Sequence, residues 1–269
     1  MPELPEVEAA VRVLRAAAEG RTIVRARVMH RSLRARVGPS RLRSLVGARV
    51  DRVERRGKHQ LLFLGDGRAV HAHFRMAGDW LVDRANEPQP RFARALVELD
   101  DGARIWLVDP RALSTLDVRD AATTLDLRLG PEATDAALRA RDLARALARR
   151  RGAIKPALLD QRLIAGIGNI YAAEALWRAR IDPRARAAAL TPSELSRLLA
   201  SVRSIMARAL AGNVRYAVYG REGLPCRRCG TPVARIVQAG RSTYFCAHCQ
   251  RHPQPARAPI SRVPRGARP

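Results

Sequence analysis

The chain has 269 residues, and its 50 Lys and Arg against 25 Asp and Glu give a formal net charge of +25. This excess excludes an ordinary neutral enzyme of small-molecule metabolism and indicates a polyanionic partner. Hydrophobic residues make up 47% of the chain, which is enough for the cores of roughly two domains. Only two of the basic residues are lysines, Lys58 and Lys155.

The sequence carries no signal for a membrane. It has no run of about 18 apolar residues, and its acidic N-terminus lacks the basic region of a signal peptide. We therefore expect a cytoplasmic, monomeric protein without membrane contact, associated with the nucleoid if the source is bacterial. In such a reducing compartment, four cysteines indicate a metal site rather than disulfides.

The first half of the chain is predicted to be one helix followed by β-strands. The helix is expected to begin near Pro5, because proline suits the first helical turn, and to end at Gly20. From about residue 22 to 127, short β-rich runs alternate with turns, and Gly-Asp-Gly at 65–67 and Asp-Asp-Gly at 100–102 indicate hairpins. These patterns predict an antiparallel β-sandwich or barrel.

The second half is predicted to be helical and to end in a small cysteine module. Helical runs are expected at about 156–163, 169–180 and 192–211, the last opened by Thr191 and Pro192, and Ala-Gly-Ile-Gly between the first two predicts a helix–two-turn–helix. The fold class is therefore α+β with two domains. The expected bounds are 1–130 for the β-sandwich with its helix, 131–215 for the helical domain, 216–252 for a finger and 253–269 for a disordered basic tail.

The cysteine spacing predicts one structural zinc ion. Two Cys-x₂-Cys pairs stand sixteen residues apart, and that interval holds a two-stranded hairpin turning at 238–240. Four thiolates complete a closed tetrahedral site, whereas the alternative is an incidental pair of reduced dithiols. The expected ligands are Cys226, Cys229, Cys246 and Cys249.

The turn at 166–169 and the N-terminus are two further candidate sites. Free N–H groups at the start of the helix after Gly168 favour a phosphate, although a plain turn capped by Asn169 explains the same residues. Removal of Met1 would leave Pro2 as a secondary amine with a pKa near 8, a usable nucleophile at neutral pH. The alternative at the N-terminus is that the nearby glutamates, Glu3 among them, only favour the helix dipole.

Taken together, these motifs resemble the formamidopyrimidine-DNA glycosylase and endonuclease VIII family. The matching segments are PELPEVE after Met1, RRGK at Lys58, HFRMAG at 73–78, DPR at 109–111, IKP at 154–156, GIGNIYAAE at 166–174 and CxxC…RSTYFCxxC. The resemblance implies a base-excision-repair enzyme that binds damaged double-stranded DNA and flips the damaged base out of the stack. It also implies AP lyase activity, with strand cutting by β,δ-elimination.

The resemblance assigns catalytic roles to four residues. It implies that Pro2 attacks the sugar and forms a Schiff base, that Glu3 donates a proton, that Lys58 assists elimination at the scissile phosphate, and that Arg241 serves the last elimination step. It further implies oxidised purines, such as formamidopyrimidine and 8-oxoguanine, as the favoured lesions. The alternatives are oxidised pyrimidines, mainly AP lyase activity, or a damaged-DNA-binding protein with weak catalysis.

The resemblance also implies a set of DNA contacts. Met76, Arg111 and Leu113 match the side chains that fill the void left by a flipped base, although ordinary packing or a surface charge are the alternatives. The further expected DNA contacts are Phe92, Arg150, Lys155 and Asn169.

The chain departs from the formamidopyrimidine branch at several positions. It has Leu113 for an aromatic residue, Arg75 for glycine and Phe92 near a usual histidine. The connection from 211 to 220 is also shorter than the lesion-capping loop of that branch. His71 and His73 share a strand face and are interpreted as network histidines rather than metal ligands, because the sequence shows no third ligand.

Overall fold

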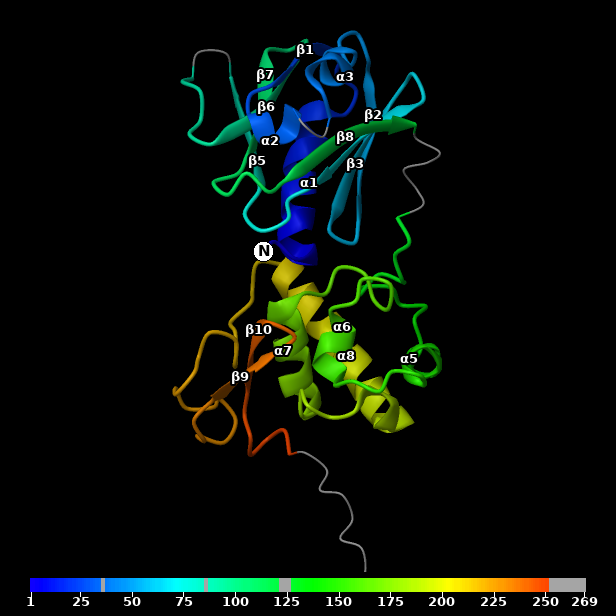
Figure 1. Cartoon of the computed structure of the whole chain (residues 1–269), viewed down its shortest axis with the longest axis vertical. Coiled ribbons are helices and arrows are strands. Elements are labelled where there is room, and N and C mark those ends of the chain that lie inside the picture. Colours follow the sequence, from blue (N-terminus) through cyan, green and yellow to red (C-terminus); the bar gives the residue numbers. More distant parts are fainter. Residues whose placement is uncertain (35–36, 85–86, 121–126, 252–269) are drawn as a thin grey trace, which may run out of the picture.

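The computed structural model describes residues 1–34, 37–84, 87–120 and 127–251, so the tail expected at 253–269 lies outside the described residues. These residues form a β-rich half and a helical half. Helix α1 (Leu4–Ala18) runs from within the β-rich half to the helical half, and the N-terminus lies where the two meet (Figure 1). The fold therefore places the chain's amino end at the junction of its two halves.

Helix α1 follows from its sequence pattern. Pro5 stands in the first turn, and the Glu6 carboxylate accepts the N–H of Glu3 at 2.9 Å, which satisfies one of the free donors at the helix start. The helix ends at Ala18, just before Gly20 with its positive φ of 79°. The predicted N-terminal helix is confirmed.

The β-rich half contains two antiparallel four-stranded sheets with a shared core. One sheet has the order β1 (Ile23–Val28), β6 (Ala93–Leu99), β7 (Ala103–Val108), β5 (Asp79–Arg84). The other has the order β2 (Val50–Arg56), β3 (His59–Leu64), β4 (Arg68–His73), β8 (Thr115–Asp120). Buried side chains of α1 and of both sheets form one hydrophobic cluster. The sandwich and both predicted hairpin turns are confirmed. Strands β5 and β8 were not singled out within the predicted β-rich range, and the short helices α2 (Arg31–Arg34) and α3 (Pro39–Arg43) were not predicted.

The helical half is built on α7 and α8. Its elements are α5 (Ala140–Leu147), α6 (Ile154–Leu158), α7 (Asn169–Ala179), the 3₁₀ turn η1 (Ala187–Ala189) and α8 (Pro192–Leu210). Helix α6 ends at Leu158 rather than near 163, because the N–H groups of Leu163 and Ile164 bond the Asp160 carbonyl in a separate turn. Thr191 caps α8 as its sequence predicts, accepting the Glu194 N–H at 3.3 Å.

The finger is a short hairpin beside α7. Strands β9 (Ala234–Gln238) and β10 (Arg241–Phe245) are antiparallel, and Ala239 and Gly240 join them with φ of 47° and 72°, the backbone of a type I′ turn. Figure 1 shows this hairpin next to α7. No helix within the described ranges is long and apolar enough to cross a membrane.

Candidate active site and zinc finger

The first residues of α1 are anchored in the helical half. Leu4 belongs to the hydrophobic core of that half, and its N–H bonds the carbonyl of Gly166 at 3.1 Å. A Cβ at Gly166 would come within 2.5 Å of the Leu4 side chain, so the close contact requires glycine, whose φ is 94°. Pro2 and Glu3 are thereby held at the junction of the two halves.

The buried Glu3 carboxylate sits on the N-terminus of α7. It accepts N–H groups from Gly168 at 2.7 Å, Ile170 at 2.8 Å and Tyr171 at 3.3 Å. The carboxylate therefore occupies the place that the sequence analysis offered to a phosphate, and it complements the helix dipole of α7 rather than that of α1. Burial raises the pKa of Glu3, and the charge of Lys58 with the N–H groups of Ile170 and Tyr171 opposes this only in part.

Lys58 reaches the same junction from the β-rich half. It lies in the turn between β2 and β3, after Gly57 with its φ of 60°, and its Nζ donates to the Ile167 carbonyl at 2.8 Å. Burial lowers the pKa of Lys58, and the charge of Glu3 offsets this only partly. The start of α1 and the β2–β3 turn, which are distant in sequence, thus bring together a carboxyl group whose pKa is raised and an amine whose pKa is lowered.

Lys155 and Asn169 bind the finger to the helical half. The buried Nζ of Lys155 donates to Asn169 Oδ1 at 2.5 Å, Thr243 Oγ1 at 2.7 Å and the Ser242 carbonyl at 3.1 Å. Asn169 donates to the same carbonyl at 2.9 Å and is the first residue of α7, with Gly168 as the cap. Burial lowers the pKa of Lys155 to about 8, and the charge of Arg241 acts in the same direction.

Two adjoining cavities bring most of the predicted site together. One, of about 310 Å³, is lined by Glu3, Asn169, Ile170, Tyr219, Ser242 and Tyr244 together with Met1, Met76 and Arg241. The other, of about 670 Å³, is also lined by Met1, Met76 and Arg241, and in addition by Lys58, His73, Arg75, Leu113, Thr115, Leu159 and Gln161. Met1 is exposed in both cavities, so its removal would open the Pro2 nitrogen to them.

Met76, Leu113 and Phe92 are exposed apolar side chains, with exposed fractions of 41%, 39% and 38%. Arg111 is also exposed. All of the predicted DNA contacts remain predictions. Among them, Met76, Leu113 and Asn169 line the two cavities, whereas Phe92, Arg111, Arg150 and Lys155 do not line them within the described part of the chain. Arg150 forms an ion pair with Asp160 at 2.6 Å.

His73 lies next to a third histidine, His59, which the sequence analysis did not connect with it. His59 Nδ1 lies 2.8 Å from His71 Nε2, and the His59 and His73 rings are 4.6 Å apart. His73 Nδ1 accepts the N–H of Arg75 at 2.9 Å. Burial lowers the pKa of His59 to about 3 and of His71 and His73 to about 4. With these low pKa values the three rings are neutral at pH 7, and their mutual contacts form the network that was the interpretation of His71 and His73.

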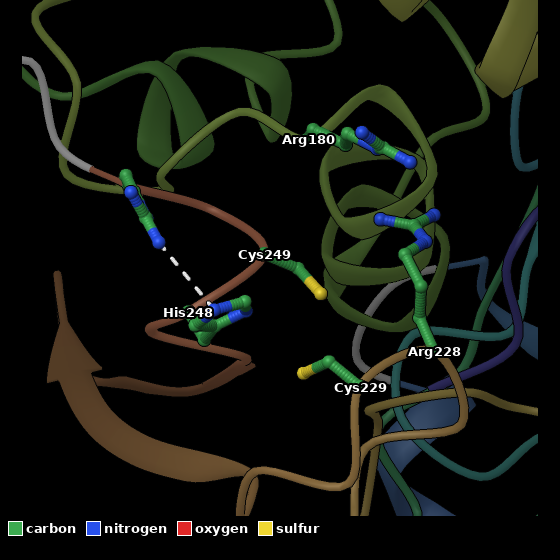
Figure 2. A pocket seen from close by; sticks show the side chains of 6 residues that line it. Arg180, Arg228, Cys229, His248 and Cys249 are labelled. Atoms are coloured by element: carbon green, nitrogen blue, oxygen red, sulfur yellow. Dashed lines mark hydrogen bonds between the residues drawn. The ribbon is translucent and has the colours of Figure 1, made fainter.

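The four predicted cysteines form a group that could hold a metal ion. Their Sγ atoms all lie within 4.8 Å of one another, as a tetrahedral zinc site requires. Figure 2 shows the sulfur atoms of Cys229 and Cys249 pointing into one pocket, with Arg228 and Arg180 beside them and His248 on the other side. A zinc ion with four thiolates carries a net charge of about −2, which these guanidinium groups offset.

The sequence analysis missed the residues that hold the short 211–220 connection. The buried Glu174 carboxylate accepts N–H groups from Ala217, Val218 and Tyr219 at 2.9–3.0 Å. Tyr219 is thereby fixed in the wall of the smaller cavity, where its ring meets that of Tyr244 edge-on at 5.1 Å. GIGNIYAAE contained Glu174, but nothing in the pattern showed that its partners lie more than forty residues further on.

The chain matches three family models in order. They are the formamidopyrimidine-DNA glycosylase N-terminal domain over residues 1–116, the H2TH domain of the same glycosylase over 129–217, and a zinc finger found in FPG and IleRS over 223–251. The chain belongs to the formamidopyrimidine-DNA glycosylase family. It is a DNA glycosylase of the base-excision-repair type whose finger holds one structural zinc ion on four cysteines.

Curated relatives and solved structures agree with the family models. The formamidopyrimidine-DNA glycosylases of Paracoccus denitrificans and Herpetosiphon aurantiacus are 40% and 37% identical, over 93% of this chain and 100% of each relative. The Lactococcus lactis glycosylase bound to DNA with an AP site is 30% identical with a TM-score of 0.87, over 93% of this chain and 99% of that one. A MutM complex with DNA carrying carbocyclic 8-oxo-G has a TM-score of 0.86 at 30% identity, over 93% and 99%.

Proposed function

We propose that this glycosylase excises oxidised bases from damaged double-stranded DNA and then cuts the strand as an AP lyase. This proposal is supported by Glu3, Lys58 and Arg241, which come from three segments distant in sequence and line two adjoining cavities. The N-terminal residue also lines both cavities. The net charge of +25 provides the electrostatic attraction for the DNA backbone. Solved structures of relatives hold DNA that contains an AP site, Fapy-dG or carbocyclic 8-oxo-G.

The nucleophile in this proposal is the secondary amine of Pro2. Once Met1 is removed, this amine stands directly before α1 and is the terminal group of the chain. The neutral nitrogen attacks C1′ of a flipped nucleotide and displaces the base. The C1′–O4′ bond then breaks, O4′ takes up the amine proton, and a cationic iminium forms. An iminium withdraws electrons from C2′, whose proton is then lost as the 3′ phosphate leaves. A second elimination releases the 5′ phosphate.

Glu3 supplies the proton for base departure. Burial raises the pKa of Glu3, which favours its protonated form, the form that can act as an acid. Its three N–H contacts hold the group in one place, and they stabilise the carboxylate that remains once the proton has gone. Lys58 and Arg241 carry the positive charge for the two departing phosphates.

Oxidised purines are the proposed lesions, in line with the names of the relatives. A second candidate is oxidised pyrimidines, favoured by the short connection at 211–220, which leaves the smaller cavity bounded by Tyr219 rather than by a long capping loop. Met76, Arg111, Leu113, Phe92, Arg150 and Asn169 remain proposed DNA contacts. The buried Lys155 amine instead donates to Asn169, Ser242 and Thr243, so it supports the finger rather than contacting DNA directly.

The test is product analysis on duplexes that carry formamidopyrimidine, 8-oxoguanine, thymine glycol, dihydrouracil or an AP site. The proposal predicts excision of at least one lesion with strand products of β- and δ-elimination. Glu3→Gln should lose base excision but keep most cleavage of the AP site, because no base remains to be protonated there. Binding of every duplex without any excision or cleavage would show a damage-binding protein instead.

A further inference from the structure

A buried aspartate organises the loop that carries Arg111 and Leu113. Asp109 is fully buried, and its carboxylate accepts the N–H groups of Arg111 at 2.9 Å and of Leu113 and Ser114 at 2.7 Å each. Its own carbonyl accepts Nε–H of the buried Arg94 at 2.7 Å. Burial raises the pKa of Asp109, but the hydrogen bonds from Ser114, Arg111 and Leu113 outweigh it, and the pKa lies below its usual value.

Ser114 connects this loop to a second one. Its buried hydroxyl lies 2.8 Å from the Asp109 carboxylate and 3.1 Å from the Phe74 carbonyl, which precedes the loop that carries Met76. The same carbonyl accepts the Gly78 N–H at 3.2 Å, so it closes the Met76 loop from its other end. A Cβ at Gly78 would overlap the Ser114 hydroxyl, which shows how closely the two loops are packed.

Both loops contain backbone that is unfavourable for their residues. Arg75, next to Met76, has a φ of 57°, and Ala112, between Arg111 and Leu113, has a φ of 55°. Non-glycine residues rarely take this left-handed conformation, and they keep it only when their surroundings hold it. The Ala112 N–H bonds the Asp109 carbonyl at 3.2 Å, so the contacts around Asp109 also hold this strained turn.

We propose that Ser114 is a positioning residue that, with Asp109, locks the two loops into one rigid wedge. Met76, Arg111 and Leu113 then enter the DNA as a unit beside the flipped base. This inference rests on the proposed function, and it adds the element that couples the three side chains. Without the Ser114 hydroxyl, each loop would still exist, but the loops would no longer move together.

The reaction rate that is lost with this coupling should depend on how far the DNA is already open. Opening a fully paired duplex needs the whole wedge, because stacking and pairing must be replaced at once. A lesion opposite a missing base is already partly open, and an AP site in a single strand needs no opening. Loss of the coupling should therefore slow only the first of these substrates.

The test compares Ser114→Ala with Ser196→Ala, which removes a serine hydroxyl bond on the exposed face of α8. Single-turnover rates are measured on a paired lesion, on the same lesion opposite a missing base, and on a single-stranded AP site. We expect Ser114→Ala to lose about ten-fold on the paired lesion and less than about two-fold on the others. Ser196→Ala should match the wild type throughout.

Two further variants test the same coupling between the loops. Gly78→Ala displaces the same hydroxyl from the opposite side and should give the same substrate-dependent loss. In a Met76→Ala background, Ser114→Ala should add little, because the wedge is already incomplete. An equal loss on all three substrates, no loss on the paired lesion, or full additivity with Met76→Ala would overturn the proposal.

A chemistry-free readout separates this proposal from the proposed function. Fluorescence of 2-aminopurine beside the lesion reports unstacking on binding. The wild type should raise it and Ser114→Ala should raise it clearly less, even if neither protein cut DNA. Equal unstacking by both proteins would overturn the role of Ser114, whereas absent cleavage by the wild type would overturn the proposed chemistry alone.

Discussion

The network of His59, His71 and His73 should make the β-sandwich sensitive to mild acid. Their folded-state pKa values of about 3, 4 and 4 lie below the ordinary value of 6.5. In the unfolded chain each imidazole takes up a proton as the pH falls through 6.5, whereas in the folded protein it stays neutral. The free energy of unfolding should therefore fall as the pH is lowered from 7.5 to 5.5.

The size of the effect follows from these shifts. A histidine that moves from 6.5 to about 4 contributes a loss of about 1.3 kcal/mol between pH 7.5 and 5.5, so three give about 4 kcal/mol. Carboxyl groups with ordinary pKa values titrate mainly below this window, so they add little. His71→Gln should reduce the loss by about one third, and His248→Gln, outside the network, should not.

Urea unfolding at three pH values in this window measures the loss. A Trp177→Phe background restricts the fluorescence signal to Trp80 and Trp106, which both lie in the β-sandwich. Zinc content is checked at each pH, because metal loss would also destabilise the chain. A free energy that does not change with pH, or an identical change in His71→Gln, would refute the reasoning.

Three other variants test the site. Gly168→Ala places a Cβ against the Glu3 carboxylate, so the rate of base excision should fall by ten-fold or more while the rate of AP-site cleavage falls less. An equal loss of both rates relative to the wild type would contradict the placement of Glu3. Arg228→Ala should speed zinc loss to a coloured chelator by about ten-fold, and an unchanged rate would remove its electrostatic role. Arg150→Ala should lower the salt dependence of DNA binding by about one unit, whereas Asp160→Asn, which frees Arg150, should strengthen binding; unchanged slopes would exclude Arg150 from the DNA contact.

Local signals in the sequence were sufficient for much of the fold. The proline and glutamate at the start of α1, the two Gly-containing hairpin turns, the Thr191 cap and the cysteine spacing each act over a few residues. Their structural outcome follows from backbone geometry alone. Strands β5 and β8 were not singled out, because each contains two aspartates, a residue type that is rare in strands, and pairing with a distant strand outweighs that preference.

The site was less accessible to sequence reasoning, because its contacts span the chain. The sequence indicated an anion at the N-terminus of α7, but the anion is the Glu3 carboxylate, 165 residues away in sequence from Gly168. Lys155 was expected at the DNA, and the structure buries its amine against Thr243 and Asn169. The third histidine of the network comes from the neighbouring strand, a position that only the strand register reveals.

The central claim is that the amine of Pro2 attacks the DNA. The chain offers few competing amines, since Lys58 and Lys155 are its only lysines. Protein from which Met1 has been removed is trapped with borohydride on an AP-site duplex, digested, and sequenced by mass spectrometry. The account predicts that the sugar adduct is found on Pro2 and that Pro2→Gly changes the yield of adduct. An adduct on Lys58 or Lys155, or none at all, would contradict it.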